Sequence, residues 1–172
     1  DVLEERELID RASIGIAVLG VTTSSALQHT SDIFDGLAPT IQESAAIDLA
    51  DCHDLGPALF ALATQCEGTT TFVHADRLRM KESDRIACME EELQKLGCQM
   101  CSDGGTVTIQ GRTTIHCNVT LNGHNDHRIV MALAVLATCG DGPVEIQGSE
   151  AVNKSYPNFF TDLERTGIRV HD

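Results

Sequence analysis

The stretch that decides the fold of this chain, residues 77–86, is Arg77-Leu78-Arg79-Met80-Lys81-Glu82-Ser83-Asp84-Arg85-Ile86. Its side chains include four cations and two carboxylic acids, and apolar residues follow it at helical spacing, at Met89, Leu93 and Leu96. Ser83 is a favourable N-cap, and Gly97 is favourable just past a helix end. The sequence therefore predicts a helix that begins at Ser83 and ends at Gly97, with a charged cluster at its N-terminus.

An internal repeat is indicated by the spacing of similar landmarks. Asp54 comes before an apolar, helix-like stretch, and Asp126 comes before another one 72 residues later. Ser83 and Ser155 are also 72 residues apart, and each opens a further predicted helix. Two landmarks at one offset favour a duplicated unit of helix, strand, helix and strand.

The predicted copies are residues 54–125 and 126–172, with a diverged partial copy in 14–50. The predicted helices cover residues 31–37, 55–64, 83–97, 129–138 and 155–167. The predicted strands cover residues 14–19, 47–49, 69–74 and 144–147. Strands over 98–101 and 107–110 are separated by Asp103-Gly104-Gly105, which predicts a hairpin.

Composition and charge exclude several classes of protein. The 172 residues carry a net charge of −14, whereas binding of nucleic acid needs a basic surface, so we expect no nucleic-acid partner. No apolar run is long enough for a membrane span, so we expect no membrane association. Seven cysteines, an odd number, favour reduced thiols in a cytoplasmic protein. We expect no metal, because Cys98 and Cys101 fall near a predicted strand, where positions i and i+3 face opposite ways.

Cationic side chains gather at the predicted helix starts, where unpaired N–H groups and the helix dipole favour anions. The cations are Lys81, Arg85, Arg128 and Lys154. Arginine binds a carboxylate through two parallel N–H groups, whereas lysine acts as a compact charge. We therefore expect a site for a multiply charged anion that carries phosphate and carboxylate groups.

Two carboxylic acids beside these cations, Asp54 and Glu82, are candidates for general acid–base chemistry. Each motif also has a simpler interpretation. Glu82 and Arg85 can form a solvated helix pair, Asp54 can be only a helix cap, and His127 can be a satisfied N-terminal histidine. The recurrence of the motifs at corresponding helix starts favours the functional interpretation.

Taken together, the motifs resemble the 5-enolpyruvylshikimate-3-phosphate synthase (3-phosphoshikimate 1-carboxyvinyltransferase) family. The segments that carry the resemblance are Asp51-Cys52-His53-Asp54-Leu55-Gly56-Pro57, residues 78–85, Asn125-Asp126-His127-Arg128-Ile129 and Asn153-Lys154-Ser155-Tyr156-Pro157. The resemblance covers about residues 20–172. It implies an α/β (α+β) fold of two domains, each built from repeated βαβαββ units whose helices pack inside small mixed sheets.

The resemblance also implies an activity, the transfer of the enolpyruvyl group of phosphoenolpyruvate to the 5-hydroxyl of shikimate 3-phosphate, with no cofactor. Asp54 would take the hydroxyl proton, and Glu82 would move the proton at the methylene carbon. Arg85 and Arg128 would hold the carboxylate of phosphoenolpyruvate. The other residues implied to bind substrate are Lys81 near the shikimate hydroxyls, Lys154 at the phosphate, and the neighbouring Asp126 and His127.

Chains of this family are more than twice as long as this one, which begins with Asp1 rather than Met. We therefore expect residues 1–172 to be a single domain, the C-terminal half of a two-domain enzyme, whose partner is the missing N-terminal half. We expect the chain alone to lack turnover. Two alternatives stay open: an enolpyruvyl transferase acting on UDP-N-acetylglucosamine, and a non-catalytic anion-binding module of the same fold.

Overall fold

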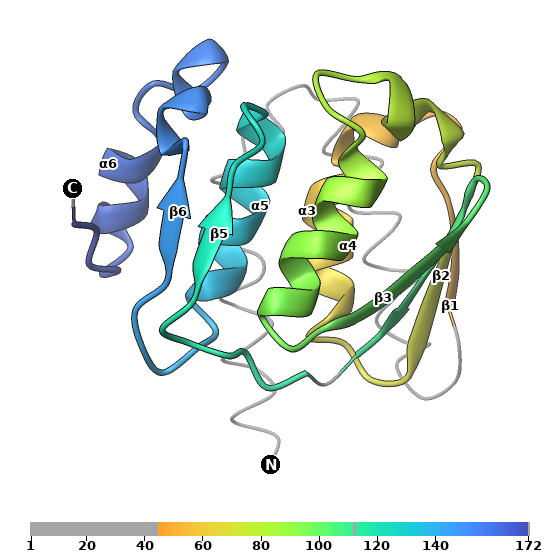
Figure 1. Cartoon of the computed structure of the whole chain (residues 1–172), viewed down its shortest axis with the longest axis horizontal. Coiled ribbons are helices and arrows are strands. Elements are labelled where there is room, and N and C mark those ends of the chain that lie inside the picture. Colours follow the sequence, from red (N-terminus) through yellow and green to blue (C-terminus); the bar gives the residue numbers. More distant parts are fainter. Residues whose placement is uncertain (1–44, 112, 172) are drawn as a thin grey trace.

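The computed structural model describes residues 45–111 and 113–171 (Figure 1). Its strands are β1 (Ala45–Asp48), β2 (Thr69–Val73), β3 (Gln99–Asp103), β4 (Thr106–Gln110), β5 (Thr120–Asn122) and β6 (Glu145–Gln147). Its α-helices are α3 (Gly56–Ala63), α4 (Arg85–Lys95), α5 (His127–Ala137) and α6 (Phe159–Arg165). Short 3-10 helices are η1 (His53–Leu55), η2 (Asp76–Met80) and η3 (Ser149–Lys154). The strand and helix predicted at 14–19 and 31–37 lie outside the described residues.

The described strands form a four-stranded mixed sheet and a separate pair. The order in the larger sheet is β1-β2-β4-β3, in which β1 runs parallel to β2 and the other neighbours are antiparallel. Strands β5 and β6 pair in parallel. Figure 1 shows α3, α4 and α5 between the larger sheet and the β5–β6 pair, with α6 beyond β6. This arrangement confirms the predicted α/β class with helices and small sheets.

The predicted hairpin is confirmed as β3 and β4, with Gly104 and Gly105 at the turn. Gly104 has a φ of 57°, which glycine adopts without the steric penalty of a side chain. At the end of α4, Gly97 has a φ of 85°, and a Cβ there would lie 2.7 Å from the His116 ring. Gly97 is therefore required both for its backbone conformation and for the close approach of the segment that contains His116.

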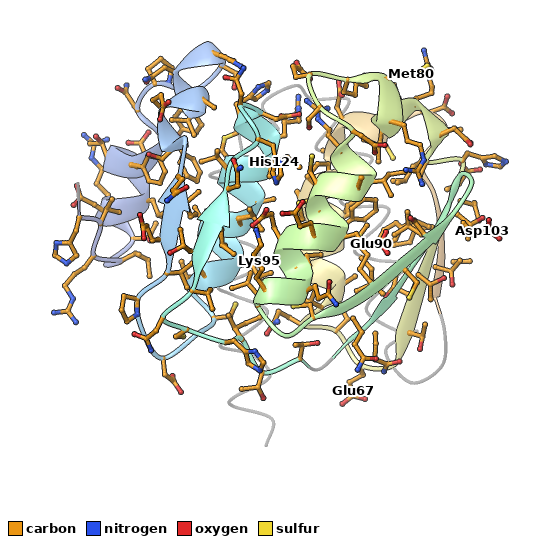
Figure 2. All side chains as sticks on the ribbon, viewed as in Figure 1. Glu67, Met80, Glu90, Lys95, Asp103 and His124 are labelled. Carbon is orange, nitrogen blue, oxygen red and sulfur yellow. The ribbon has the colours of Figure 1, made fainter. Side chains whose placement is uncertain are left out.

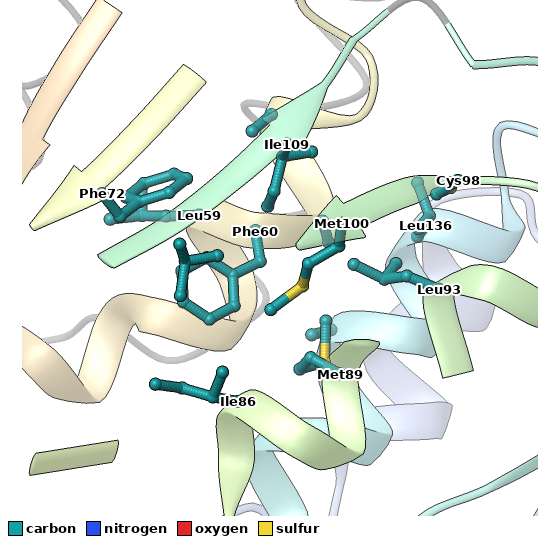
Figure 3. Packing of buried hydrophobic residues seen from close by; sticks show 14 of the residues in the cluster. Leu59, Phe60, Phe72, Ile86, Met89, Leu93, Cys98, Met100, Ile109 and Leu136 are labelled. Atoms are coloured by element: carbon teal, nitrogen blue, oxygen red, sulfur yellow. The ribbon is translucent and has the colours of Figure 1, made fainter. Parts of the chain in front are cut away.

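The main core lies between the larger sheet and α3, α4 and α5 (Figure 3). Every member of the predicted helical stripe is fully buried there, namely Ile86, Met89, Leu93 and Leu96. Phe60 of α3 packs edge-on against Phe72 of β2, with ring centroids 4.9 Å apart. A second cluster covers the opposite side of α5, where Val130 and Met131 pack with Phe159 of α6. Helix α5 thus joins the two clusters, which explains why it is apolar on nearly all sides.

Several predicted boundaries are wrong in an informative way. Helix α4 begins after Asp84, whose side chain accepts a hydrogen bond from Ala87 N, so Asp84 and not Ser83 is the N-cap. The segment before it, for which the sequence predicted neither helix nor strand, contains the 3-10 helix η2. Ser155 ends η3, and α6 starts later, at Phe159, with no side-chain cap at Asn158. Sequence alone could not choose between adjacent capping residues, because the choice depends on which one has another partner.

The elements after Asp54 and after Asp126 follow the same order. Helix α3, strand β2, η2 and α4 come after Asp54, whereas α5, β6, η3 and α6 come after Asp126. The division into repeated units, and the assignment of the chain to one half of a larger protein, stay predictions. Among the described residues, no helix has both the length and the apolar character needed to cross a lipid bilayer.

Candidate active site

Three helices begin at the same end of the molecule. Figure 1 shows the N-termini of α3, α4 and α5 along its upper edge, where η1, η2 and η3 also lie. All eight residues proposed for the site from the sequence are on these segments or directly before them. The fold therefore brings to one edge motifs that are as far as 100 residues apart in the chain.

Arg85 is at the centre of this edge and is almost completely buried, with a side-chain exposure of 1%. Its Nε donates to Asp126 Oδ2 at 2.8 Å, and its Nη2 donates to Asp126 Oδ1 at 3.3 Å. Nη1 donates to Asp54 Oδ1 at 3.0 Å, and Nη2 also donates to Glu82 Oε2 at 2.6 Å. One guanidinium thus holds three carboxylates, including both candidate acid–base residues.

Asp126 is the most deeply buried carboxylate of this network, and its side chain has no solvent exposure. Besides Arg85, it accepts hydrogen bonds from Ser83 Oγ at 3.0 Å and from Arg128 N at 2.9 Å. The last of these bonds makes Asp126 the N-cap of α5, which starts at His127, two residues before the predicted start at Ile129. Burial alone would raise the pKa of Asp126, but the hydrogen bonds and charge of Arg85 outweigh it and hold the pKa below its ordinary value. Asp126 is therefore ionised at neutral pH and aligns Arg85.

Asp54 and Glu82, the other two carboxylates bound by Arg85, are partly open to solvent, with side-chain exposures of 50% and 44%. Lys81 Nζ lies 3.1 Å from Asp54 Oδ1, so Asp54 is bound by two cations. Burial acts to raise the pKa of Asp54, but the hydrogen bond from Lys81 and the charges of Arg128, Lys81 and Arg85 lower it overall. Asp54 is therefore ionised at neutral pH.

Arg128 differs from Arg85 in its surroundings. Its side chain is half-buried, and it makes no hydrogen bond or ion pair with another residue in the described part of the chain. It lies close enough to Asp54 to lower the pKa of that carboxyl group. Arg128 therefore offers a guanidinium that can receive an anion without first giving up a protein partner.

His127, between Asp126 and Arg128, is buried, and its Nδ1 has no hydrogen-bond partner. Burial lowers the pKa of His127 below its ordinary value. The ring is consequently neutral at pH 7, although Asp126 is adjacent. The unsatisfied nitrogen is itself buried, so it is not directly open to solvent.

Lys154 does not stand at a helix start, as the sequence suggested, but at the end of η3. Its exposed Nζ donates to both the backbone carbonyl and the side-chain oxygen of Asn125, the latter at 2.8 Å. Because Asn125 comes directly before Asp126, this bond places the Lys154 ammonium beside the start of α5. The structure thus assembles five proposed residues in one ion-pair network and sets His127, Arg128 and Lys154 next to it.

The two cysteines considered for metal binding differ in exposure, since Cys98 is buried and Cys101 is exposed. Another group, Glu91, Glu92 and His124, brings three potential ligand atoms within 4.8 Å of one another. Lys95 Nζ, however, lies 3.2 Å from Glu91 Oε1 and 2.8 Å from Glu92 Oε1. The lysine thus already supplies a positive charge between the carboxylates.

Sequence reasoning missed two residues of this region. Ser83 was interpreted as a helix cap, whereas its hydroxyl group donates to Asp126. Glu92, on the inner side of α4, was assigned no role, yet it is a fully buried carboxylate. A glutamate beside Leu93 in the apolar stripe was the available signal, because an ionised side chain is rarely buried without partners.

Comparisons with known proteins show first the fold and then the family. The enolpyruvyl transferase NikO from Streptomyces tendae has a similar structure, with a TM-score of 0.58 at 22% sequence identity over 69% of this chain and 26% of that one. At this level of identity the similarity concerns the fold. An EPSP synthase from Acinetobacter baumannii superposes with a TM-score of 0.62 at 34% identity, over 66% of this chain and 27% of that chain.

The family profile of EPSP synthase (3-phosphoshikimate 1-carboxyvinyltransferase) matches residues 16–163. The 3-phosphoshikimate 1-carboxyvinyltransferase of Clostridium acetobutylicum is 44% identical over 126 residues, which are 73% of this chain and 29% of that protein. The protein of the same name from Halorubrum lacusprofundi is 40% identical over 72% of this chain and 27% of its own length. The chain belongs to the EPSP synthase family. It spans less than a third of the length of the curated relatives that it matches.

Proposed function

We propose that this chain supplies one wall of the active site of a 3-phosphoshikimate 1-carboxyvinyltransferase. In the proposed reaction, the 5-hydroxyl oxygen of shikimate 3-phosphate bonds to C2 of phosphoenolpyruvate, and the methylene carbon takes up a proton. The resulting tetrahedral intermediate then loses that proton and phosphate, which leaves the enolpyruvyl ether. The observation that carries the proposal is that Arg85 holds Asp54 and Glu82 together, although they are 28 residues apart in the sequence.

The two carboxylates have distinct roles in this proposal. Asp54, which is kept ionised by Lys81 and the nearby arginines, accepts the proton of the 5-hydroxyl group. Glu82 gives a proton to the methylene carbon and takes one back. Both residues are half-open to solvent, as groups that must reach a substrate have to be.

Different cationic side chains bind the carboxylate and the phosphate of phosphoenolpyruvate in this proposal. Arg128, whose side chain has no hydrogen-bond or ion-pair partner among the described residues, receives the carboxylate of phosphoenolpyruvate, and His127 lies beside it. Lys154 binds the phosphate that leaves. Arg85 contributes positive charge at the carboxylate and can make a direct contact only by exchanging Asp54 or Glu82 for the ligand. Asp126 is buried beneath Arg85 and supports the site without reaching the substrate.

The partner proposed for this wall is the N-terminal half of the same enzyme, acting in the cytoplasm. Catalysis at a cleft requires groups from both sides to orient the substrates and exclude water. We therefore expect no phosphate release when this chain alone is mixed with phosphoenolpyruvate and shikimate 3-phosphate. Turnover should occur in the complete protein that contains this sequence, and its absence there would refute the proposed function.

A binding experiment tests the ligand assignments. Phosphoenolpyruvate is titrated into the chain while the ¹H–¹⁵N spectrum is recorded, and the amide signals of residues 126–128 should shift. Arg128→Gln should remove most of that shift because it deletes a guanidinium that no side chain in residues 45–111 or 113–171 holds. Arg165→Gln is the matched control, since Arg165 pairs with Asp162 on α6, at the far side of β6 from α4. An unchanged titration in Arg128→Gln would contradict the assignment.

A further inference from the structure

Glu92 is a fully buried carboxylate on α4 that the proposed reaction does not use. Lys95 Nζ donates to both of its oxygens, at 2.8 and 2.9 Å, and Asn122 N donates to Oε2 at 3.0 Å. His124 Nε2 lies 2.8 Å from Oε1. Burial acts to raise the pKa of Glu92, but the hydrogen bonds from Lys95, Asn122 and His124 outweigh it, so the pKa is lowered. Glu92 is therefore ionised at neutral pH and has three partners.

Two of these partners belong to the end of β5 and to the loop that follows it. Figure 2 shows His124 in this region and Lys95 on the neighbouring α4. His124 and Asn125 have φ values of 49° and 53°, a left-handed conformation that is unfavourable for residues with a side chain. Such a conformation persists only when the surrounding contacts hold it. Gly123 adds a spatial restriction, because a Cβ there would lie 2.4 Å from Val130 Cγ2.

The constrained loop leads directly into the proposed site. Asn125 accepts the hydrogen bonds of Lys154, and the next residue is Asp126, which caps α5 and binds Arg85. Arg128 follows in the first turn of α5. A displacement of the loop at His124 would therefore move the phosphate-binding lysine and the carboxylate-binding arginine together.

We infer that Glu92 is a positioning residue that holds the left-handed loop at His124 and thereby sets the positions of Asp126, Arg128 and Lys154. The inference rests on the proposed function for its effect on phosphoenolpyruvate. Its structural part, the dependence of the loop on Glu92, stands on the hydrogen bonds alone. Glu92 acts through His124 and the Asn122 backbone and does not contact a substrate.

The kinetic test compares Glu92→Gln with Glu91→Gln in the complete protein that contains this sequence. Both changes remove one negative charge next to Lys95. Glu91 is exposed and, in the described part of the chain, has no hydrogen bond with the loop, although its carboxylate lies within 4.8 Å of the His124 ring nitrogen. Glu92→Gln should raise the KM for phosphoenolpyruvate about tenfold, since small displacements of positioned groups have large effects. The KM for shikimate 3-phosphate should change less. Glu91→Gln should leave both values within about twofold of the unmodified protein, as expected for a surface change.

A second variant keeps the inference testable if Glu92→Gln does not fold. His124→Asn retains a residue that tolerates the left-handed conformation, but its shorter side chain cannot reach Glu92. It should raise the same KM, and the double variant should be no worse than Glu92→Gln alone, because the two side chains act as one unit. If His124→Asn leaves the KM for phosphoenolpyruvate unchanged, or if Glu92→Gln behaves like Glu91→Gln, the inference is wrong.

A ligand-free measurement separates this inference from the proposed function. In ¹H–¹⁵N spectra of the chain, His124→Asn should shift the amide signals of Asp126 and Arg128, whereas Glu91→Gln should not. Absence of phosphate release from the complete unmodified protein would refute the proposed function and leave this comparison intact. Unshifted signals of Asp126 and Arg128 in His124→Asn would overturn the positioning role whatever the activity.

Discussion

Helices α4 and α5 each begin with an aspartate N-cap followed closely by an arginine, and the two arginines have different surroundings. Arg85, directly after Asp84, is buried and bound by three carboxylates from three segments. Arg128, two residues after Asp126, is half-buried and has no side-chain partner among the described residues. The difference arises because the cap of α5 also serves as the counter-ion of Arg85, whereas the cap of α4 pairs outward with Arg79.

The comparison teaches that two similar local motifs can place their arginines in different environments, one bonded within the fold and one more accessible. Arg85 stabilises the fold by linking η1, α4 and the start of α5, and its N–H groups are largely used for that purpose. The guanidinium of Arg128 has no such partner among the described residues. A buried, fully bonded arginine beside a more accessible one is the arrangement that the proposed binding of an anion would use.

The largest expected effect comes from removing the buried arginine. Arg85→Met should lower the free energy of unfolding by about 3–5 kcal/mol, because it leaves Asp126 charged, buried and without its main partner. Arg128→Met is the matched control and should cost less than about 0.5 kcal/mol. Urea unfolding followed by circular dichroism measures both. Equal losses in the two variants would show that the arginines do not differ as described.

An intermediate effect is expected for Asp126→Asn, which preserves the cap acceptor but removes the charge beneath Arg85. Loss of a charge-assisted hydrogen bond should cost about 1.5–3 kcal/mol at neutral pH. In the unmodified protein, the pKa of Asp126 is lower when folded than its ordinary value of 3.8. The unfolded chain therefore binds the proton first as pH falls, so this stability is present above about pH 4 and is lost below it.

The measurement is a series of urea unfolding curves between pH 7 and pH 3. Asp126→Asn should show a shallower loss of stability below about pH 4 than the unmodified protein, since it lacks the titrating group. Asp141→Asn is a suitable control because Asp141 is exposed and distant from Arg85 in the sequence. An acid response of Asp126→Asn as steep as that of Asp141→Asn would contradict the role of Asp126.

The smallest effect is expected at the cap of α4. Asp84→Ala should destabilise the protein by about 1 kcal/mol, because it removes the acceptor for Ala87 N. Asp84→Asn should destabilise the protein by only a few tenths of a kcal/mol, since asparagine is an equally good cap. Thermal unfolding of the two variants tests whether Asp84 acts mainly as a cap. A loss in Asp84→Asn as large as in Asp84→Ala would assign the effect to the ion pair with Arg79.

Much of the local structure could be predicted from the sequence. The stripe of Ile86, Met89, Leu93 and Leu96 predicted the buried side of α4, and the Asp103-Gly104-Gly105 turn predicted the hairpin. These features depend on periodicity and on backbone preferences of single residues, which are local properties. The helix start at Ser83 was mispredicted because Ser83 and Asp84 are both good caps, and only the contact of Ser83 with Asp126 decides between them.

For the candidate site too, the sequence predicted local features but not the contacts between distant segments. Residue types and the repetition of motifs identified Asp54, Glu82, Arg85 and Arg128 as a charged group at helix starts. The sequence by itself determined the helices, the hairpin and the presence of these charges, because each is encoded within a few neighbouring residues. Only the tertiary structure decided which arginine is buried and which is accessible, and that Glu92 holds the loop before α5. Burial and ion pairing depend on which distant segments come together, and that information lies in the packing of the whole fold.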